Sequence, residues 1–119
     1  MNSKTILIVD DDTAILDALS SMLISEGYDV ITDTGTDVLN KVKGYLPKII
    51  LLDVLLSGRD GRAICKKIKQ QQNLKTIPVI LISAHPQIRA TYKEYGADAF
   101  LAKPFDIDDL LDLIQKYVK

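Results

Sequence analysis

The sequence has 119 residues, of which 47% are hydrophobic and 26% are charged, and its formal net charge is −1. This length predicts one domain over residues 1–119 with its own hydrophobic core, and the small net charge gives no basis for nucleic-acid or membrane binding through bulk charge. A single cysteine, Cys65, excludes an internal disulfide and is typical of a reducing compartment. The N-terminus lacks a signal-peptide pattern, so we expect a cytoplasmic protein.

The N-terminal part begins with an apolar run over residues 6–9, which predicts a buried strand. The run stops at the acidic triplet Asp10-Asp11-Asp12, and Thr13 is the predicted N-cap of a first helix that ends at Gly27. After it we expect a less apolar strand near an edge of the sheet, over 28–32, and a short helix from 35 to about 44.

The middle of the chain contains the run Ile49-Ile50-Leu51-Leu52-Asp53. Consecutive apolar residues are typical of a strand that is buried on both faces of a parallel sheet. Because a charge is costly inside such a strand, Asp53 should lie just beyond its C-terminal edge. A third helix is predicted from about 60 to 71, with two isoleucines inward and three lysines outward, namely Ile64 and Ile68, and Lys66, Lys67 and Lys69.

The C-terminal part supplies two more strands and two more helices. A strand over 79–82 ends at Ser83, and Pro86 suits the first turn of a fourth helix, which ends at Gly96. A thin apolar stripe of this helix, formed by Tyr92 and Tyr95, is expected to face the core. A fifth strand over 99–102 ends at Lys103-Pro104, and a last helix runs from about 106 to 117.

Strands that alternate with helices predict an α/β fold, a doubly wound parallel sheet with helices on both faces. The flavodoxin-like (βα)5 strand order 2-1-3-4-5 is chosen by analogy, and it places the first and third strands side by side. Asp10, Asp11 and Asp53 would then meet at one edge of the sheet, where open α/β sheets bind ligands.

Three converging carboxylates repel one another, and Mg²⁺ would remove that repulsion because it takes oxygen ligands. An isolated acidic triplet is more often a helix-capping turn, but Asp53 and Lys103 at the ends of two other strands favour a site. Asp53 is the candidate nucleophile, since carboxylates attack phosphorus to form acyl phosphates. Lys103 would neutralise charge, and the Ser83 hydroxyl would bind a phosphoryl oxygen, although each taken alone reads as a solvated charge or a helix cap.

Four segments carry a family resemblance, in this order: Ile6-Leu7-Ile8-Val9-Asp10-Asp11-Asp12, Ile50-Leu51-Leu52-Asp53 with Asp60-Gly61, Ile80-Leu81-Ile82-Ser83-Ala84, and Gly96-Ala97-Asp98-Ala99-Phe100 with Lys103-Pro104-Phe105. With these spacings the chain resembles, over its whole length, the receiver domains of response regulators in two-component signalling, in a single-domain form. The resemblance implies that Asp53 accepts a phosphoryl group from the phosphohistidine of a sensor histidine kinase or a phosphotransfer protein.

The resemblance also implies the roles of the surrounding residues. Asp11 would bind Mg²⁺ directly and Asp10 largely through water, with Asp53 and the backbone carbonyl of Leu55 as further ligands. Lys103 would contact the phosphoryl group, and its bond to Pro104 would be cis. Such a domain is not an enzyme, beyond self-catalysed phosphotransfer and autodephosphorylation.

A switch is implied as well. Ser83 would move toward the phosphoryl group, the ring of Phe100 would turn inward, and the face built from the fourth helix, fifth strand and fifth helix would change shape by a population shift. A downstream protein would bind that face, with no direct binding to nucleic acid or membrane. No output domain follows Lys119, so we expect signalling by protein contact, a phosphate relay, or excision from a larger protein.

Some positions depart from the family pattern. Leu56-Ser57 stands where relatives often have Met-Pro, so we expect a slightly looser loop, and Phe100 lacks the hydroxyl of the tyrosine often found there. His85 stands at a variable position beside the site. Its simpler interpretation is a partly exposed residue at a helix start, and the sharper hypothesis is that His85 and the apolar Leu55 tune the access of water to the phosphoaspartate.

Other functions stay open. Asp10-Asp11-Asp12-Thr13 also fits the start of haloacid-dehalogenase-type phosphatases, with Asp10 as nucleophile and Asp12 as acid/base, although the chain is short for that fold. A pseudo-receiver would fold alike and act as a docking module without phosphorylation. A flavodoxin-like cofactor binder is disfavoured, because an acidic triplet after the first strand would repel a phosphate.

Overall fold

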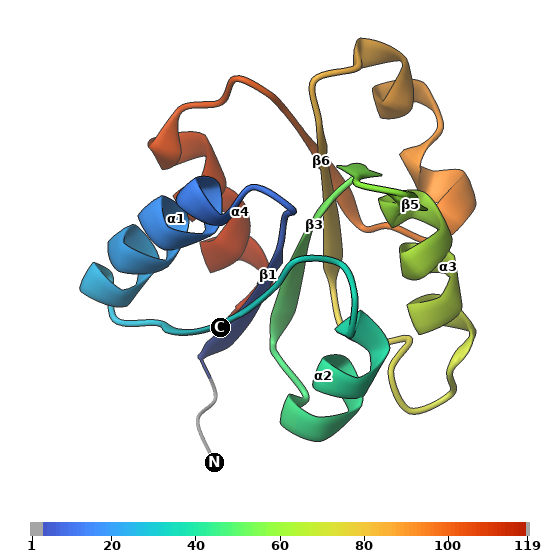
Figure 1. The fold of residues 1–119 in the computed structure, drawn as a ribbon, viewed down its shortest axis with the longest axis horizontal. Helices are drawn as coiled ribbons and strands as arrows, with labels where there is room; N and C mark the ends of the chain where they lie inside the picture. Colours follow the sequence, from blue (N-terminus) through green and yellow to red (C-terminus); the bar gives the residue numbers. More distant parts are fainter. Residues whose placement is uncertain (1–3, 119) are drawn as a thin grey trace.

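The structure, a computed structural model, describes residues 4–118 (Figure 1). Met1–Ser3 and Lys119 lie outside the described residues. The prediction that the N-terminus lacks a signal peptide falls partly on these residues. Five parallel strands form one sheet in the spatial order β2-β1-β3-β6-β7, which confirms the flavodoxin-like order. The strands are β1 (Thr5–Val9), β2 (Asp29–Asp33), β3 (Ile49–Asp53), β6 (Val79–Ser83) and β7 (Ala99–Ala102).

Helices cover both faces of the sheet, with α1 and α4 on one side and α2 and α3 on the other (Figure 1). The bounds are α1 (Thr13–Ser25), α2 (Val38–Tyr45), α3 (Gly61–Gln70) and α4 (Ile107–Tyr117), with two short 3₁₀ helices, η1 (Pro86–Ala90) and η2 (Tyr92–Tyr95). A hairpin that the sequence did not predict, β4 (Leu55–Leu56) and β5 (Arg59–Asp60), follows β3. Within residues 4–118, no helix has the length and apolar character that crossing a bilayer requires.

The alternation of side chains along the central strands divides the core into two clusters. Leu7 and Ile50 belong to the cluster that residues of α2 and α3 complete, whereas Ile8 and Leu51 belong to the cluster of α1 and α4. Every residue of β3 is buried. Burial of each aliphatic side chain contributes about 1.5–3 kcal/mol, so the strand that ends at Asp53 is firmly fixed.

The ends of two N-terminal elements differ from the prediction. Asp12, rather than Thr13, is the N-cap of α1, because its carboxylate accepts the Ala14 N–H at 2.9 Å. The edge strand β2 was predicted over 28–32 and lies one residue later. Its parallel register with β1 pairs Thr5 with Asp29 and Val9 with Asp33.

The predicted fourth helix is wrong in type. Residues 86–95 form η1 and η2 in place of one α-helix, and Thr91 between them has a non-helical φ of −124° and ψ of −2°. The bonds of this segment run from residue i to i−3, as in Glu94 N–H to the Thr91 carbonyl at 2.9 Å. Only a thin apolar stripe, chiefly Ile88 and Tyr92, packs against the core, so tertiary contacts do not enforce α-helical geometry.

Lys69 points inward, which makes the prediction of an outward side chain wrong. Its ammonium donates to the backbone carbonyls of Lys75 and Ile77, at 3.1 and 2.7 Å, and to Asp98 Oδ2 at 2.8 Å. The same oxygen of Asp98 accepts the Val79 N–H at 2.8 Å. The pair therefore ties the end of α3 to the start of β6 and to the residue before β7.

Replacing Lys69 with Met is expected to lower the free energy of unfolding by about 2–3 kcal/mol, because three acceptors lose a charged donor. The measurement is urea unfolding followed by circular dichroism. Lys66→Met is the matched control, since Lys66 lies exposed on the same helix and should change stability by less than about 0.5 kcal/mol. Equal unfolding midpoints for the two variants would contradict the assigned role of Lys69.

Candidate functional site

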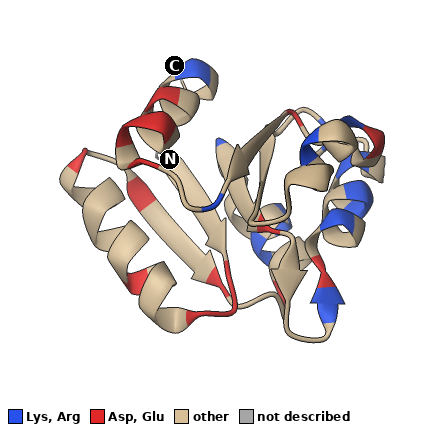
Figure 2. Ribbon diagram, turned by 90° about the horizontal axis from the view of Figure 1, so that it is seen from above, with Lys and Arg blue, Asp and Glu red and all other residues tan. Residues whose placement is uncertain are grey.

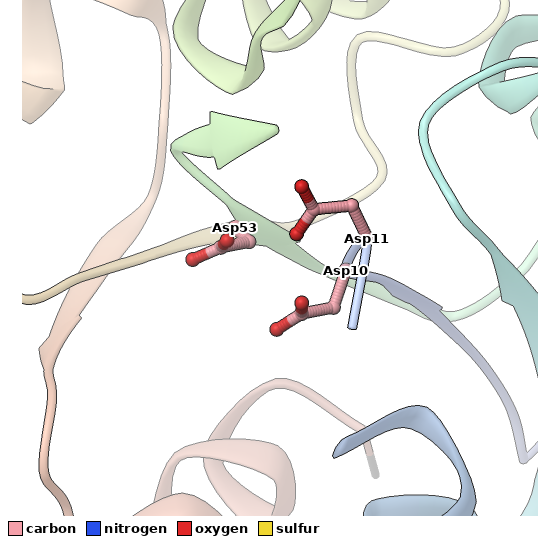
Figure 3. A group of neighbouring side chains, drawn as sticks. All are labelled: Asp10, Asp11 and Asp53. Carbon is pink, nitrogen blue, oxygen red and sulfur yellow. The ribbon is translucent and has the colours of Figure 1, made fainter. Parts of the chain in front are cut away.

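Three carboxylates gather at the C-terminal edge of the sheet, as the sequence predicted. Asp10 follows β1 and Asp53 ends β3, and the parallel register that pairs Val9 with Leu52 brings the two strand ends together. One oxygen of each of Asp10, Asp11 and Asp53 lies within 4.8 Å of the others (Figure 3). Asp10 and Asp53 are only 5% and 7% exposed, so two of these charges lie largely out of water.

Lys103 supplies the cation that faces this cluster. Its Nζ lies 3.1 Å from Asp53 Oδ1 and 3.3 Å from Asp10 Oδ2. The end of β7 is held in place because the Lys103 N–H donates to the Ser83 carbonyl at 2.9 Å. The Lys103–Pro104 bond is cis, which confirms that expectation.

The electrostatics of Asp53 and Lys103 follow from this geometry. Burial raises the pKa of the Asp53 carboxyl, and the nearby Lys103 ammonium offsets that effect only in part. Burial also acts to lower the pKa of Lys103, but Asp53 and Asp10 outweigh it, so the pKa of the ammonium is raised. Asp53 is therefore a carboxylate whose charge is costly to bury and is only partly neutralised by Lys103.

Asp11 differs from its neighbours because it is exposed and held by Ser57. The Ser57 backbone N–H and hydroxyl both donate to Asp11 Oδ2, at 2.8 and 2.6 Å. These bonds hold the pKa of the Asp11 carboxyl below its usual range. Sequence reasoning missed Ser57 as a site residue, and the only signal was its departure from the Met-Pro pattern.

Ser83 and His85 lie beside the cluster without contacting it through a described hydrogen bond. Ser83 ends β6 and is 2% exposed. Its Oγ accepts the His85 N–H at 3.0 Å, and His85 is the N-cap of η1. His85 is exposed, and Leu55 is 56% exposed, so both side chains border solvent at this edge.

Phe100 already lies inward. Its side chain is 7% exposed and stacks on Tyr92 with ring centroids 6.2 Å apart. The Arg89 guanidinium lies over the same ring, 5.0 Å from its centroid. The Phe100 ring therefore already occupies the inward position that the family resemblance implies for the switched state.

The donor set fits a hard divalent cation. The cluster is made of carboxylate oxygens, which are the ligands that Mg²⁺ takes in proteins. Neither histidine nor cysteine belongs to the cluster found among residues 4–118, so softer metals have no preferred ligand there. Charge is distributed unevenly around it: in Figure 2, Lys and Arg gather on the α3 side of the sheet, and Asp and Glu predominate on the α1 side.

Comparison with known sequences gives one consistent result. A model of the response regulator receiver domain matches residues 6–115. The response regulator ArlR of Staphylococcus aureus is 37% identical over 117 residues, which are 96% of this chain and 52% of that protein. The chain spans about a quarter to a half of the length of the first curated relatives that it matches.

Solved structures agree with the sequence comparison. A putative response regulator from Chloroflexus aurantiacus J-10-fl has a TM-score of 0.89 at 32% identity and covers 97% of both chains. The receiver domain of the sensor histidine kinase PA1611 from Pseudomonas aeruginosa PAO1, with a magnesium ion coordinated in its active site cleft, has a TM-score of 0.87 at 27% identity. Both likenesses extend over nearly the entire chain.

Proposed function

The chain belongs to the response regulator receiver domain family, and from this we propose that Asp53 accepts a phosphoryl group from a phosphohistidine. The observation that carries the proposal is the placement of Asp53, buried at the end of β3 with Lys103 Nζ 3.1 Å from its Oδ1. An oxygen of Asp53 attacks phosphorus, the bond from phosphorus to the donor histidine breaks, and an acyl phosphate forms.

Mg²⁺ would be held by Asp10, Asp11 and Asp53, with the Leu55 carbonyl as a further ligand. When bound, the metal neutralises charge on the phosphoryl oxygens. The magnesium ion in the similar PA1611 receiver domain and the oxygen donor set of this chain support the assignment. Lys103 orients and neutralises a phosphoryl oxygen, because its ammonium already lies between two of these carboxylates.

The response to phosphorylation starts at Ser83. Its hydroxyl binds the His85 N–H, so a move toward the phosphoryl group releases that amide and frees the start of η1. The affected face consists of residues 86–95, β7 and α4, and it would bind a downstream protein. Differential contacts in the two states shift the population. His85 and Leu55, exposed beside the site, would tune the access of water to the phosphoaspartate.

The phosphodonor would be a sensor histidine kinase or a phosphotransfer protein. An apolar groove of about 460 Å³ lies next to Lys103 and is lined by α1 and the connection from β7 to α4, including Ile15, Leu19 and Phe105. Apolar side chains of a docking protein would fit this groove, and its lining includes Lys103, whose Nζ lies 3.1 Å from Asp53 Oδ1.

The proposal is tested with acetyl phosphate and Mg²⁺. We expect the intact mass to rise by one phosphoryl group, peptide mapping to place it on Asp53, and EDTA to reduce labelling to background, because the carboxylates then repel the anionic donor. Asp12→Asn keeps the cap of α1 and should label like the wild type.

Other outcomes favour the other functions. A label on Asp10 together with phosphate release that depends on Asp12 would indicate an aspartate-nucleophile phosphatase. No label from acetyl phosphate or from any phosphorylated kinase would indicate a pseudo-receiver that acts as a docking module.

A further inference from the structure

The turn between β4 and β5 carries Ser57, which contacts the acidic cluster directly. Its N–H and hydroxyl both donate to Oδ2 of Asp11, and the two residues are separated by 46 positions in the sequence. The bonds therefore join the loop after β1, which carries Asp10 and Asp11, to the segment that follows Asp53 at the end of β3.

Asp11 needs such a partner more than the other two acids do. Asp10 and Asp53 are buried, and packing limits their conformations, whereas Asp11 is exposed. An exposed carboxylate on a loop samples several rotamers, and a metal that binds it must order it. Ser57 orders it beforehand, because two donors at 2.8 and 2.6 Å fix the position of one carboxylate oxygen.

Two effects of Ser57 on a bound cation oppose each other. Hydrogen bonds draw electron density from the carboxylate, which weakens its attraction for a cation, but they also hold it in place. Positioning is the larger effect, because both donors use Oδ2 and neither uses Oδ1, and partners that orient a metal ligand typically strengthen the site. A proline at this position has no N–H and no hydroxyl, so it would supply neither bond.

We propose that Ser57 is a positioning residue for the divalent cation, holding the Asp11 carboxylate in the orientation in which it binds Mg²⁺. This inference rests on the proposed function of the site. It assigns a role to the residue at which this chain departs from the Met-Pro pattern: the loop is anchored to a metal ligand through the serine itself.

The test is a titration of the full chain with Mg²⁺, in which binding is monitored by NMR through the backbone amide resonances of the loop after β1. Ser57→Ala should weaken Mg²⁺ binding about tenfold, and Ser57→Thr, which keeps both donors, should restore most of the affinity. Ser21→Ala, an exposed serine on α1, is the matched control and should bind like the wild type. In an Asp11→Asn background, Ser57→Ala should have little further effect, because the ligand that Ser57 positions is already lost.

The possible failures are distinguishable. A wild-type chain that does not bind Mg²⁺ would overturn the proposed function and this inference with it. A wild-type chain that binds Mg²⁺, with equal or tighter binding in Ser57→Ala, would overturn the inference alone. So would an effect of Ser57→Ala that persists undiminished in the Asp11→Asn background.

Discussion

Replacing Asp53 with Asn is expected to abolish phosphoryl uptake and, at neutral pH, to make the protein more stable. Uptake is lost because the amide is not a nucleophile toward phosphorus. Stability rises because Asp53 is 7% exposed and shares its surroundings with two other carboxylates, against one lysine. The gain should be on the order of 1 kcal/mol, which corresponds to a melting temperature about 4 °C higher for a domain of this size.

The pH dependence of this gain has a definite sign. Burial raises the pKa of Asp53 above the ordinary value of 3.8, so the folded state binds the proton more tightly than the unfolded state does. The cost of the charge therefore appears as the pH rises from about 3.8 through the folded-state pKa, and it is complete above that pKa. Asp53→Asn removes the cost, so its advantage should be present at pH 7 and vanish in acid.

Thermal unfolding between acid and neutral pH measures this difference. Asp17→Asn, an exposed change of the same charge on α1, is the control and should leave the melting temperature nearly unchanged. Added Mg²⁺ should raise the melting temperature of the wild type more than that of Asp53→Asn, because one ligand is lost. A variant that is less stable than the wild type at pH 7 would refute the electrostatic account of Asp53.

Replacing Gly61 with Ala is expected to cost about 3 kcal/mol of stability, at the upper end of what overpacking costs. A Cβ at Gly61 would clash with the carbonyl oxygen of Asp53 and lie 3.0 Å from Val54 Cα. These are backbone atoms, which cannot rotate away as a side chain would. The start of α3 is held against them, since the Gly61 N–H donates to the Val54 carbonyl at 2.8 Å. The clash would also displace Asp53, so labelling should slow by about tenfold or more.

Gly44→Ala is a matched control for this substitution. Gly44 lies in α2, and a Cβ there would meet nothing within 4 Å. Alanine has the better helix propensity, so this variant should gain up to about 1 kcal/mol. Urea unfolding and labelling rates measured together separate the two effects. A Gly61→Ala protein that is as stable and as reactive as Gly44→Ala would show that α3 moves away from β3 without cost.

The sheet and the carboxylate cluster could be predicted because they depend on patterns that are local in the sequence. Runs such as Ile49–Leu52 identify strands, and a polar residue at the end of a run lies at the edge of the sheet. The strand order needed an analogy with the flavodoxin-like fold, since apolar runs do not say which strands are neighbours. Once the order was chosen, the meeting of Asp10, Asp53 and Lys103 followed from it.

The features that the sequence did not predict depend on contacts between residues that are distant in the sequence. The sequence pattern predicted Lys69 as one of three exposed lysines. Only the fold brings its ammonium to the backbone carbonyls and to Asp98, which accept hydrogen bonds from it. The sequence pattern showed Ser57 only as the absence of a proline that relatives often have. Its hydrogen bonds to Asp11 are apparent only in the folded chain, where the two loops are adjacent. The segment 86–95 carries the spacing of a helix, but too few apolar side chains to hold one.

The 3₁₀ geometry of residues 86–95 separates two properties of this domain. Ile88 is the one buried side chain of η1 and η2, whereas each of the four α-helices within residues 4–118 has at least two buried residues. Segments with few buried contacts open at lower cost than the core. Local opening of this segment thus costs much less than unfolding the domain. Under the proposed function, we expect the face that includes residues 86–95 to change while the core remains intact, so substitutions in this segment should alter partner binding with little effect on fold stability.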